Sequence, residues 1–472
     1  MNKPKARFYL FFIVLLTIAA CSPPPAESVP TEQAPKAAAE SPPTESEPAE
    51  ASTSLDSTVI TWFVQTDEIE QAWEQEFIIP AFEAIHPEIS INLVVVPWNE
   101  FEVEFAALAA AGAPPDIWSH SGTDNFADYL NRGQVADLTP YIERDAYDLS
   151  DFIPEALQAY NIDGKLYGLP IQTTASFVFY NRDLFDAAGV AYPPTSWDDT
   201  TWTYAAFLEK CDALTAHTDD SAQAVYGCLL DAWPNDQYAL MFGQSIYPPE
   251  AYTTGFASKA YLDSEAAIAG FQARQDIVWK YGYMPDPAQL QPLISDAGLF
   301  ESQKVAMQLT GGWGWTNFAG LEAQFNWGVA PIPYGSPDRK AITYTDPWML
   351  SSRSAHPDEA WEFLKYLVSP EAQKAYLEIV NAPPARQSVA EIWYTQFPSM
   401  NPEQVKELHL GGLEYGQETP SHMLVEYDQL NRVVTISTTP IFMNMSKAAD
   451  VLPEANANLE KALLQIQTEY GE

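Results

Sequence analysis

The stretch KLYGLPIQTTASFVFYNRDLFDAAG, residues 165–189, decides the fold of this chain. Pro170 prevents a helix from continuing, and residues 171–180 are rich in β-branched and aromatic side chains, which predicts a buried strand. Residues 181–183 then turn the chain, and a short helix follows that Gly189 ends as a C-cap. The stretch therefore predicts a long buried strand followed directly by a turn and a helix.

This segment resembles the crossover segment of extracellular solute-binding proteins of the maltose-binding type. In that family a Gly-x-Pro, followed by a strand that ends in Tyr-Asn, carries the chain from one lobe into the other. The matching positions here are Gly168, Pro170, Tyr180, Asn181, Phe185, Ala188 and Gly189. The resemblance implies an α/β fold of type II, in which two lobes, each a mixed sheet flanked by helices, are joined by crossover hinge strands.

Further motifs occur in the order that the family has. Residues 110–117 resemble its Ala-Ala-Gly-x-x-Pro-Asp signature with one extra proline, and residues 193–198 resemble its Pro-x-Thr-Trp-Asp-Glu stretch, with Asp199 in place of the glutamate. Residues 344–352 resemble the return crossover, and residues 383–388 resemble a Pro-x-Arg-x-Ser found after it. Together these motifs extend the resemblance over most of the chain.

The resemblance covers roughly residues 59–390 and fades beyond them. A chain of this length is in any case too long for a single hydrophobic core. The implied division has two interrupted lobes: an N-terminal lobe of residues 59–172 and 346–390, and a C-terminal lobe of residues 173–345 and 391–472.

Residues 1–21 form a predicted targeting segment, with a basic start and the apolar run Phe8–Ile18. The segment ends Ile-Ala-Ala-Cys at Cys21, which resembles the lipobox of bacterial lipoproteins and implies cleavage before a lipidated Cys21. An ordinary signal peptide is the alternative. Residues 22–58 are rich in Pro, Ala, Ser, Thr and Glu, so we expect a disordered linker that tethers an extracytoplasmic protein to the cell membrane through its lipid anchor only.

The composition narrows the range of partners. The formal net charge of −41 argues against nucleic acid and anionic lipid. Cys211 and Cys228 could form a disulfide after export, with two separate buried thiols as the alternative, and no spacing of Cys or His resembles a metal site. We expect a monomer.

Hydrophobic periodicity predicts strands alternating with helices. A strand over residues 59–64 precedes a helix whose buried face would carry Trp73, Phe77, Ala81 and Ala84. Continuous apolar strands with helices between them indicate a sheet that is covered on both faces.

No enzyme motif is present. The chain lacks His-Glu-x-x-His, Gly-x-Ser-x-Gly and a phosphate-binding loop. Glycosidases use a pair of Asp or Glu side chains, but carboxylates are so numerous in this chain that finding such a pair says almost nothing about catalysis. We therefore expect a protein that is not an enzyme and needs no cofactor, with an anchored glycan hydrolase as the alternative.

Tryptophans at loop positions give a stronger signal. A sugar presents a face of C–H groups that indole rings bury, while polar groups bind its hydroxyls. Trp313 and Trp315 follow a predicted strand within a glycine-rich stretch, and in the family the first tryptophan of this motif stacks on sugar. Trp313 and Trp315 are therefore candidate ligand contacts, with packing in the core as the alternative.

Other candidates follow strand ends, because ligands in open α/β sheets bind beyond the carboxyl ends of strands. The candidates of this kind are Gln65, Thr66, Trp118, His120, Thr123 and Asp124. The crossover segments and a second-lobe loop add Gln172, Thr174, Trp233, Tyr344 and Trp348. The family position of Thr174 holds a ligand-binding acid in the maltose binder, so the threonine here argues against maltodextrin.

The resemblance implies a substrate-binding protein of an ATP-driven importer. It would capture a mono- or oligosaccharide in the cleft between the lobes and dock on membrane permease subunits, with the ATPase on another chain. A peptide, polyamine or phosphate ester is the alternative ligand. The small number of basic residues disfavours an anionic ligand such as a phosphate ester. Acids such as Asp124 would suit a polyamine.

Overall fold

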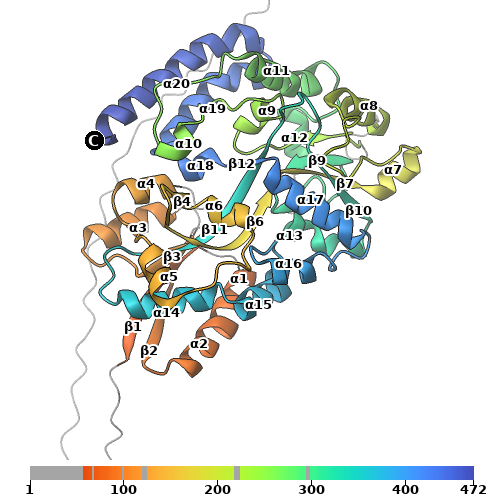
Figure 1. The fold of residues 1–472 in the computed structure, drawn as a ribbon. Helices are drawn as coiled ribbons and strands as arrows, with labels where there is room; N and C mark the ends of the chain where they lie inside the picture. Colours follow the sequence, from red (N-terminus) through yellow and green to blue (C-terminus); the bar gives the residue numbers. More distant parts are fainter. Residues whose placement is uncertain are drawn as a thin grey trace, which may run out of the picture. The chain divides into compact units, whose positions relative to one another are not determined.

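The computed structural model describes residues 57–65, 68–97, 100–119, 125–216, 224–293 and 298–471. These residues form two mixed sheets, a small hairpin of β4 (Asn161–Ile162) and β5 (Lys165–Leu166), and many helices (Figure 1). The helices in chain order are α1 (Glu68–Ala72), the π-helical segment η1 (Trp73–Ile78), α2 (Ile79–Ile85), α3 (Phe101–Ala110), α4 (Phe126–Asn131), α5 (Thr139–Asp145), α6 (Pro154–Gln158), α7 (Arg182–Ala188), α8 (Tyr204–Leu214), α9 (Asp236–Leu240), α10 (Ala251–Thr254), α11 (Glu265–Trp279), α12 (Pro287–Leu293), α13 (Gly314–Ala319), the 3-10 helix η4 (Gly320–Ala323), α14 (Pro357–Leu367), α15 (Pro370–Val380), α16 (Gln387–Trp393), α17 (Pro402–Glu414), α18 (Pro420–Met423), α19 (Tyr427–Phe442) and α20 (Ala448–Tyr470).

The first sheet combines strands from distant parts of the chain. Its order is β12-β11-β3-β1-β2, and β6 also pairs with β11. β1 is parallel to β2 and β3, whereas β11 is antiparallel to β3 and β6. The bounds are β1 (Thr58–Val64), β2 (Ile89–Val95), β3 (Ile117–Ser119), β6 (Leu169–Ala175), β11 (Ala341–Leu350) and β12 (Gly416–Glu418).

The second sheet has the order β10-β7-β9-β8. β7 runs antiparallel to both of its neighbours, and β8 is parallel to β9. All of its strands are buried. The bounds are β7 (Phe177–Asn181), β8 (Leu229–Leu230), β9 (Met307–Thr310) and β10 (Trp327–Ala330).

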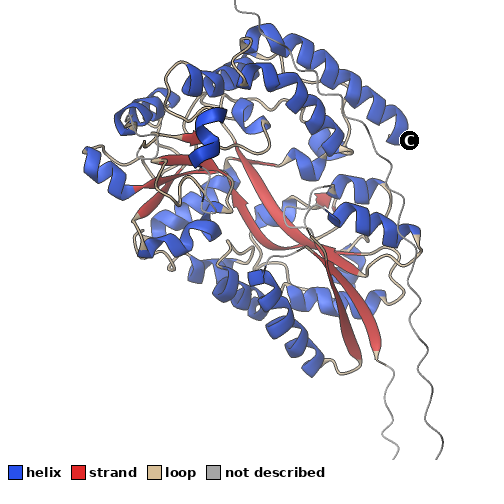
Figure 2. Ribbon diagram, turned by 180° about the vertical axis from the view of Figure 1, so that it is seen from behind, coloured by secondary structure: helices blue, strands red, loops and turns tan. Residues whose placement is uncertain are grey.

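The predicted strand over residues 171–180 is divided between the two sheets. It forms β6 in the first sheet and β7 in the second, with Ser176 between them. The Ser176 amide donates to the carbonyl of Ile342 on β11 (2.8 Å), so the backbone stays paired at the point of transfer. We call the antiparallel pair of β6 and β11 the crossover ribbon. Figure 2 shows these long strands running from one sheet to the other.

The helix after the crossover begins and ends as its sequence predicts. The Asn181 side chain accepts a hydrogen bond from the Leu184 amide (3.1 Å), and Gly189 ends α7 at a φ of 67°. Pro357 likewise starts α14, and Ser369 caps α15 through the Ala372 amide (3.1 Å). These local signals depend on neighbouring residues only, so they could be predicted from the sequence.

The first helical run differs from the prediction, because it contains the π-helical segment η1. A π turn takes one more residue than an α turn and therefore rotates the buried face. Trp73, Ile78 and Phe82 are buried, whereas the expected Phe77 and Ala81 are only partly buried and Ala84 is exposed. The predicted face was correct at Trp73 and wrong beyond it.

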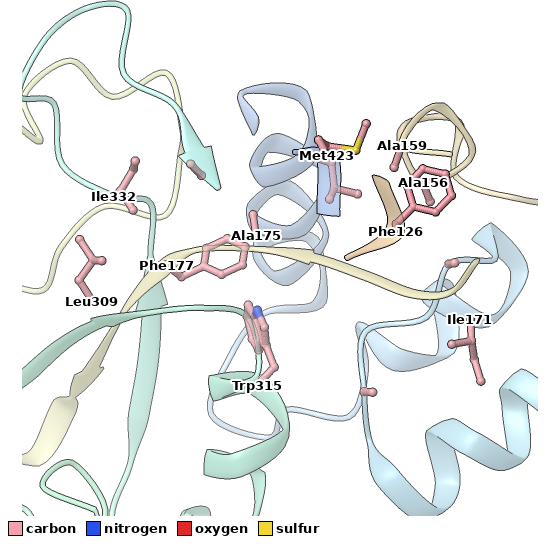
Figure 3. Packing of buried hydrophobic residues seen from close by; sticks show 14 of the residues in the cluster. Phe126, Ala156, Ala159, Ile171, Ala175, Phe177, Leu309, Trp315, Ile332 and Met423 are labelled. Carbon is pink, nitrogen blue, oxygen red and sulfur yellow. The ribbon is translucent and has the colours of Figure 1, made fainter. Parts of the chain in front are cut away.

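Aromatic side chains dominate the core of the second sheet. In Figure 3 the indole of Trp315 lies beside the crossover strand, and its ring centroid is 5.7 Å from that of Phe177. Trp393 and Phe397 pack on the same indole at 5.2 and 5.0 Å. The hydrophobic face of α13 is thereby fixed against β7.

The C-terminal helices contact elements next to both sheets. α20 buries Leu459, Leu463 and Ile466, as predicted. Gln275 on α11 donates to the carbonyl of Ile441 (2.9 Å), whereas Asn131 on α4 donates to the carbonyl of Tyr470 (3.2 Å). The lobe boundaries given above, and the assignment of residues 391–472, therefore stay predictions.

Two further expectations concern covalent links and membranes. Cys211 on α8 is bonded to Cys228 just before β8, with Cα atoms 5.4 Å apart, so the predicted disulfide is present. The targeting segment with Cys21, and the linker except for its last two residues, lie outside the described residues. Within the described ranges, no helix is both long and apolar enough to cross a bilayer.

Candidate functional site

The register of the crossover ribbon places four polar or aromatic residues on one face. Gln172 pairs with Asp346, and Thr174 pairs with Tyr344. Side chains alternate between the two faces of a strand, and residues opposite each other share a face. We call the surface formed by Gln172, Thr174, Tyr344 and Asp346 the front face of the ribbon. Three of these residues were predicted from the sequence, and Asp346 was not.

An exposed pair of tryptophans lies at the second-sheet end of this face. The rings of Trp313 and Tyr344 are 5.1 Å apart at an angle of 63°, and the Tyr344 hydroxyl donates to the carbonyl of Trp233. Trp313 and Trp233 are each 39% exposed, which is unusual for tryptophan. We call Trp233, Trp313 and Tyr344 the aromatic group. The structure thus brings together three candidates from separate segments.

Close backbone packing fixes the aromatic group on the ribbon. A Cβ atom on Gly312 would lie 1.9 Å from Oγ1 of Thr174, so only glycine allows the Trp313 loop to approach β6 this closely. Trp313 directly precedes α13, whose first residue is Gly314. Its indole therefore stays outside the helix and beside the front face.

A small cavity lies at the first-sheet end of the same face. It has a volume of about 30 Å³ and is lined by the predicted residues Gln65, Gln172 and Trp348. Asp346 also lines it and accepts a hydrogen bond from Nε2 of Gln172. The Trp348 ring stacks on that of Trp73 at 6.4 Å and 14°.

Among the residues that the structure describes, three carboxylates line this cavity, so we call it the carboxylate cavity. They are Asp346 together with Glu70 and Glu74 from the helical run after β1. Glu70 accepts a hydrogen bond from the Tyr376 hydroxyl (2.8 Å). Burial, and then the charge of Glu70, raises the pKa of Tyr376 well above its usual value, so this tyrosine stays a donor.

Sequence reasoning missed Glu70 and Glu74, although one signal was present. Both lie on the helix that follows β1, whose carboxyl end was expected to face the ligand. Glu70 and Glu74 are four residues apart and share a helix face. Glu74 is buried on the π-helical segment, which a regular α-helical period does not reveal.

Two predicted contacts lie in the core instead. Trp118 and Trp315 are both 0% exposed, so in this structure neither ring can touch a ligand. Trp118 packs on Phe105 (5.0 Å) and Tyr129 (5.6 Å), while Trp315 fills the core of the second sheet. In this structure Trp118 and Trp315 therefore pack in the core, and the ligand contacts predicted for them are not available. The candidates Thr66, His120, Thr123 and Asp124 lie outside the described residues.

A second, larger cavity of about 720 Å³ lies against the opposite face of the ribbon. Thr173, Thr343 and Thr345 line it, together with Glu418. Glu418 is already held, because it accepts hydrogen bonds from Thr343 (2.9 Å) and from Nδ1 of His422 (2.7 Å). This cavity contains no member of the aromatic group, so we place the candidate site on the front face despite its smaller volume.

The arrangement on the front face suits binding. Exposed indoles offer apolar surfaces, and the partly exposed amide of Gln172 offers hydrogen bonds beside them, whereas Thr174, Tyr344 and Asp346 are buried. No group of His, Cys, Asp or Glu in the described ranges is placed to hold a metal ion. The front face can therefore hold a polar ring-shaped molecule by stacking and hydrogen bonding.

Comparison with known proteins points in the same direction. A family model described as bacterial extracellular solute-binding protein matches residues 65–374. The chain is 28% identical over 300 residues to a binding protein of Brucella abortus (strain 2308), an alignment that covers 62% of this chain and 67% of that protein. It is 22% identical over 406 residues to the galactooligosaccharide-binding protein of Bacillus subtilis (strain 168), covering 83% and 82%.

A solved structure resembles the chain over most of its length. The ABC substrate-binding protein Lmo0181 from Listeria monocytogenes, solved in complex with cycloalternan, superposes with a TM-score of 0.71 at 22% sequence identity. The superposition covers 86% of this chain and 99% of that one. At this identity the likeness is evidence of a shared fold.

Proposed function

We propose a carbohydrate-binding role from one premise: the chain belongs to the bacterial extracellular solute-binding protein family. Its fold is the two-lobe type II fold of these proteins, as predicted. In our proposal the protein captures a saccharide on the front face of the crossover ribbon and delivers it to the permease of an ABC importer.

One observation carries the proposal. The aromatic group exposes two indoles beside a ribbon that is rich in hydrogen-bonding side chains. Stacking on indole removes the C–H face of a sugar from water, and each such stacked ring contributes on the order of 1 kcal/mol. Gln172 lies on the same face of the ribbon, is partly exposed and would bind hydroxyls in the plane of the ring, whereas Oγ1 of Thr174 is buried without a partner.

The names of the relatives support a saccharide. The Bacillus subtilis relative is a galactooligosaccharide-binding protein, and the Listeria monocytogenes structure holds cycloalternan. The two ligands differ, so they support the class of ligand and leave the particular sugar open.

The ribbon provides the hinge in this proposal. We assign residues 59–172 and 346–390 to one lobe and residues 173–345 and 391–472 to the other. A ligand that contacts both lobes binds the closed form more tightly than the open form and therefore shifts the population toward closure. The closed form would then dock on the permease, and the ATPase would be a separate chain.

The sequence before residue 59 is the basis for our proposal that the protein is anchored to the outside of the cell membrane. We propose that Cys21 carries lipid and that residues 22–58 hold the lobes away from the membrane surface. Expression of the full chain in a bacterial host tests this: the protein should fractionate with membranes, and Cys21→Ser should release it. Membrane fractionation that is unchanged by Cys21→Ser would overturn the anchor.

The ligand is tested by isothermal titration calorimetry with neutral disaccharides to pentasaccharides, amino sugars, spermidine and short peptides. We expect at least one saccharide to bind with a dissociation constant in the micromolar range or below. A protein that binds only spermidine or peptides would overturn the carbohydrate role. Release of reducing sugar from a glycan panel by the purified protein would favour the hydrolase alternative instead.

A further inference from the structure

We propose that Asp128 and Arg132 on α4, together with Glu426 at the start of α19, form a proton-sensitive latch that holds the two lobes together when Asp128 is protonated. We call these three residues the α4 latch. The inference goes beyond the proposed function and takes from it only the movement of the lobes about the crossover ribbon. It makes that movement respond to pH as well as to the solute.

The latch joins elements that pack on different sheets. The ring of Tyr129 on α4 lies 5.6 Å from that of Trp118 on β3, in the first sheet. The ring of Phe442 on α19 lies 6.0 Å from that of Tyr238 on α9. The Tyr238 hydroxyl donates to the carbonyl of Leu230 on β8, in the second sheet (3.3 Å). A contact between α4 and α19 therefore connects the two sides of the molecule that the ribbon joins.

Hydrogen bonds and an ion pair form this contact. Both carboxylate oxygens of Asp128 accept from the backbone amide of Glu426, at 3.2 and 3.1 Å. Nη2 of Arg132 lies 3.0 Å from Oε1 of Glu426 and 3.7 Å from Oδ1 of Asp128. Next to the latch, the amide of Asn125 donates to the carbonyl of Ser421 (2.9 Å). The contact thus places one guanidinium between two carboxylates.

Burial makes the ionised form of Asp128 costly. Asp128 is 5% exposed, whereas Arg132 and Glu426 stay in partial contact with water. Burial, and then the charge of Glu426, raises the pKa of Asp128 to about 7, although Arg132 and the Glu426 amide act in the opposite direction. Protonation of Asp128 removes the buried charge and leaves Arg132 to pair with Glu426.

Further titratable groups of the described residues surround the latch, and each of those named here is an acid or a phenol. They are Glu102 on α3, Tyr129 on α4, Asp428 on α19, and Glu469 and Tyr470 at the end of α20. Glu102 adds to the rise in the pKa of Asp128, and it accepts a hydrogen bond from the Tyr129 hydroxyl (2.7 Å). These groups favour a protonated Asp128. His120 and Asp124, in the loop before α4, lie outside the described residues.

The direction of the pH effect follows from the change in the surroundings of Asp128. When the lobes separate, α4 leaves Glu426, and Asp128 returns to water with its usual pKa of 3.8. Between pH 3.8 and pH 7 the latched form therefore binds a proton that the separated form lacks. Lowering the pH through 7 stabilises the latch, and raising the pH above 7 removes this stabilisation. From pH 8 to pH 6 the equilibrium should shift about 10-fold toward the latched form.

The test measures the distance between the lobes and needs no ligand. Spin labels are attached at Val103→Cys on α3 and Ile436→Cys on α19, two positions that are 69% and 73% exposed. The full chain also carries Cys21→Ser, and Cys211 and Cys228 are bonded to each other, so the labels react at the new cysteines. We expect double electron–electron resonance to show a ratio of short to long distances that is about 10-fold higher at pH 6 than at pH 8.

Variants assign the response to the latch. Asp128→Asn resembles the protonated side chain, so it should keep the short distance at pH 8 and remove the dependence on pH. Glu426→Gln should move the response to lower pH, because the charge of Glu426 raises the pKa of Asp128. Asp428→Asn is the matched control, since Asp428 lies on the same helix but is exposed, and it should leave the response unchanged.

The outcomes separate the latch from the proposed function. A distance distribution that is the same at pH 6 and pH 8, or a pH response that persists in Asp128→Asn, overturns the latch and leaves carbohydrate binding intact. Circular dichroism checks that each variant is folded, and the pH comparison on the labelled protein and the shift in Glu426→Gln do not depend on Asp128→Asn. A response to pH in a protein that binds no saccharide supports the latch and overturns the proposed function.

Discussion

Trp313 and Trp315 show how neighbouring residues of one type acquire different roles. The sequence offered both as ligand contacts, because both follow the same strand within a glycine-rich stretch. The difference arises from α13, which begins at Gly314 and turns Trp315 into the core while Trp313 stays outside. A two-residue spacing carries no information on where a helix begins, so only the family resemblance, in which the first tryptophan stacks on sugar, favoured Trp313 over Trp315.

We predict that Trp313→Ala weakens saccharide binding by about 10-fold or more and changes thermal stability little, because the ring is substantially exposed. Trp315→Ala should instead lower the free energy of unfolding by about 3–5 kcal/mol through the cavity it leaves. Calorimetric titration and urea unfolding of both variants measure the contrast. Loss of stability in Trp313→Ala with unchanged affinity would contradict the assignment.

A buried histidine beside the hinge gives a pH dependence. His409 on α17 donates from Nε2 to the carbonyl of Thr173 (2.9 Å), and its Nδ1 accepts from the Tyr394 hydroxyl (3.2 Å). Burial lowers the pKa of His409 from 6.5 to about 4. Between these values the unfolded chain binds a proton that the folded protein excludes. The stabilising contribution of His409 is therefore complete above pH 6.5 and is lost as the pH falls toward 4.

We predict that between pH 7 and pH 5 this effect removes about 2 kcal/mol from the free energy of unfolding. Asp128 and Asp236 act in the opposite direction, because burial raises their pKa values to about 7 and about 6. The measurement must therefore be the difference between the unaltered protein and His409→Gln, in which these groups cancel. A difference that stays constant over this pH range would refute the prediction.

At the scale of elements, the helical run after β1 shows where sequence patterns fail. A regular α-helical period predicts Trp73, Phe77 and Ala81 on one face, yet the π-helical segment buries Ile78 and Phe82 instead. Caps and breakers, such as Asn181 and Gly189, were predicted correctly since each acts within a few residues. A π turn is stabilised by tertiary packing, which a single sequence does not display.

The contact between α11 and α9 gives a prediction about backbone packing. A Cβ atom on Gly270 would lie 2.0 Å from the carbonyl oxygen of Tyr238, and backbone atoms cannot move aside cheaply. We expect Gly270→Ala to lower the free energy of unfolding by about 3 kcal/mol. Gly320→Ala, whose Cβ would meet nothing within 4 Å, should be neutral or slightly stabilising. Equal stability of the two variants in urea unfolding would refute this account.

At the scale of the whole molecule, the type II fold was predicted from the order of its motifs rather than from its strands. The resemblance located both crossovers, and the structure pairs them as β6 and β11. It gave no sign of β12, a strand of three residues that joins β11 far along the chain. Such a short segment has no period of its own, and only its neighbour in space defines it as a strand.

Closure around the ligand is the prediction at this scale. We expect a saturating saccharide to reduce the radius of gyration measured by small-angle X-ray scattering, because the ligand favours the closed form. At a ligand concentration equal to the dissociation constant of the unaltered protein, Trp313→Ala should show a much smaller reduction in radius, because about a tenth or less of it is occupied. A radius that does not change on saturation of the unaltered protein would show that binding and lobe movement are uncoupled.

β12 is the last strand of the first sheet to be synthesised, and this order has a consequence for how the protein folds. The first sheet contains β1 (Thr58–Val64) and β12 (Gly416–Glu418). A ribosome therefore synthesises the first and the last strand of this sheet far apart in time. Distant pairings form slowly and only after the intervening polypeptide has emerged. The first sheet of a nascent molecule therefore stays incomplete until residues 416–418 have left the ribosome.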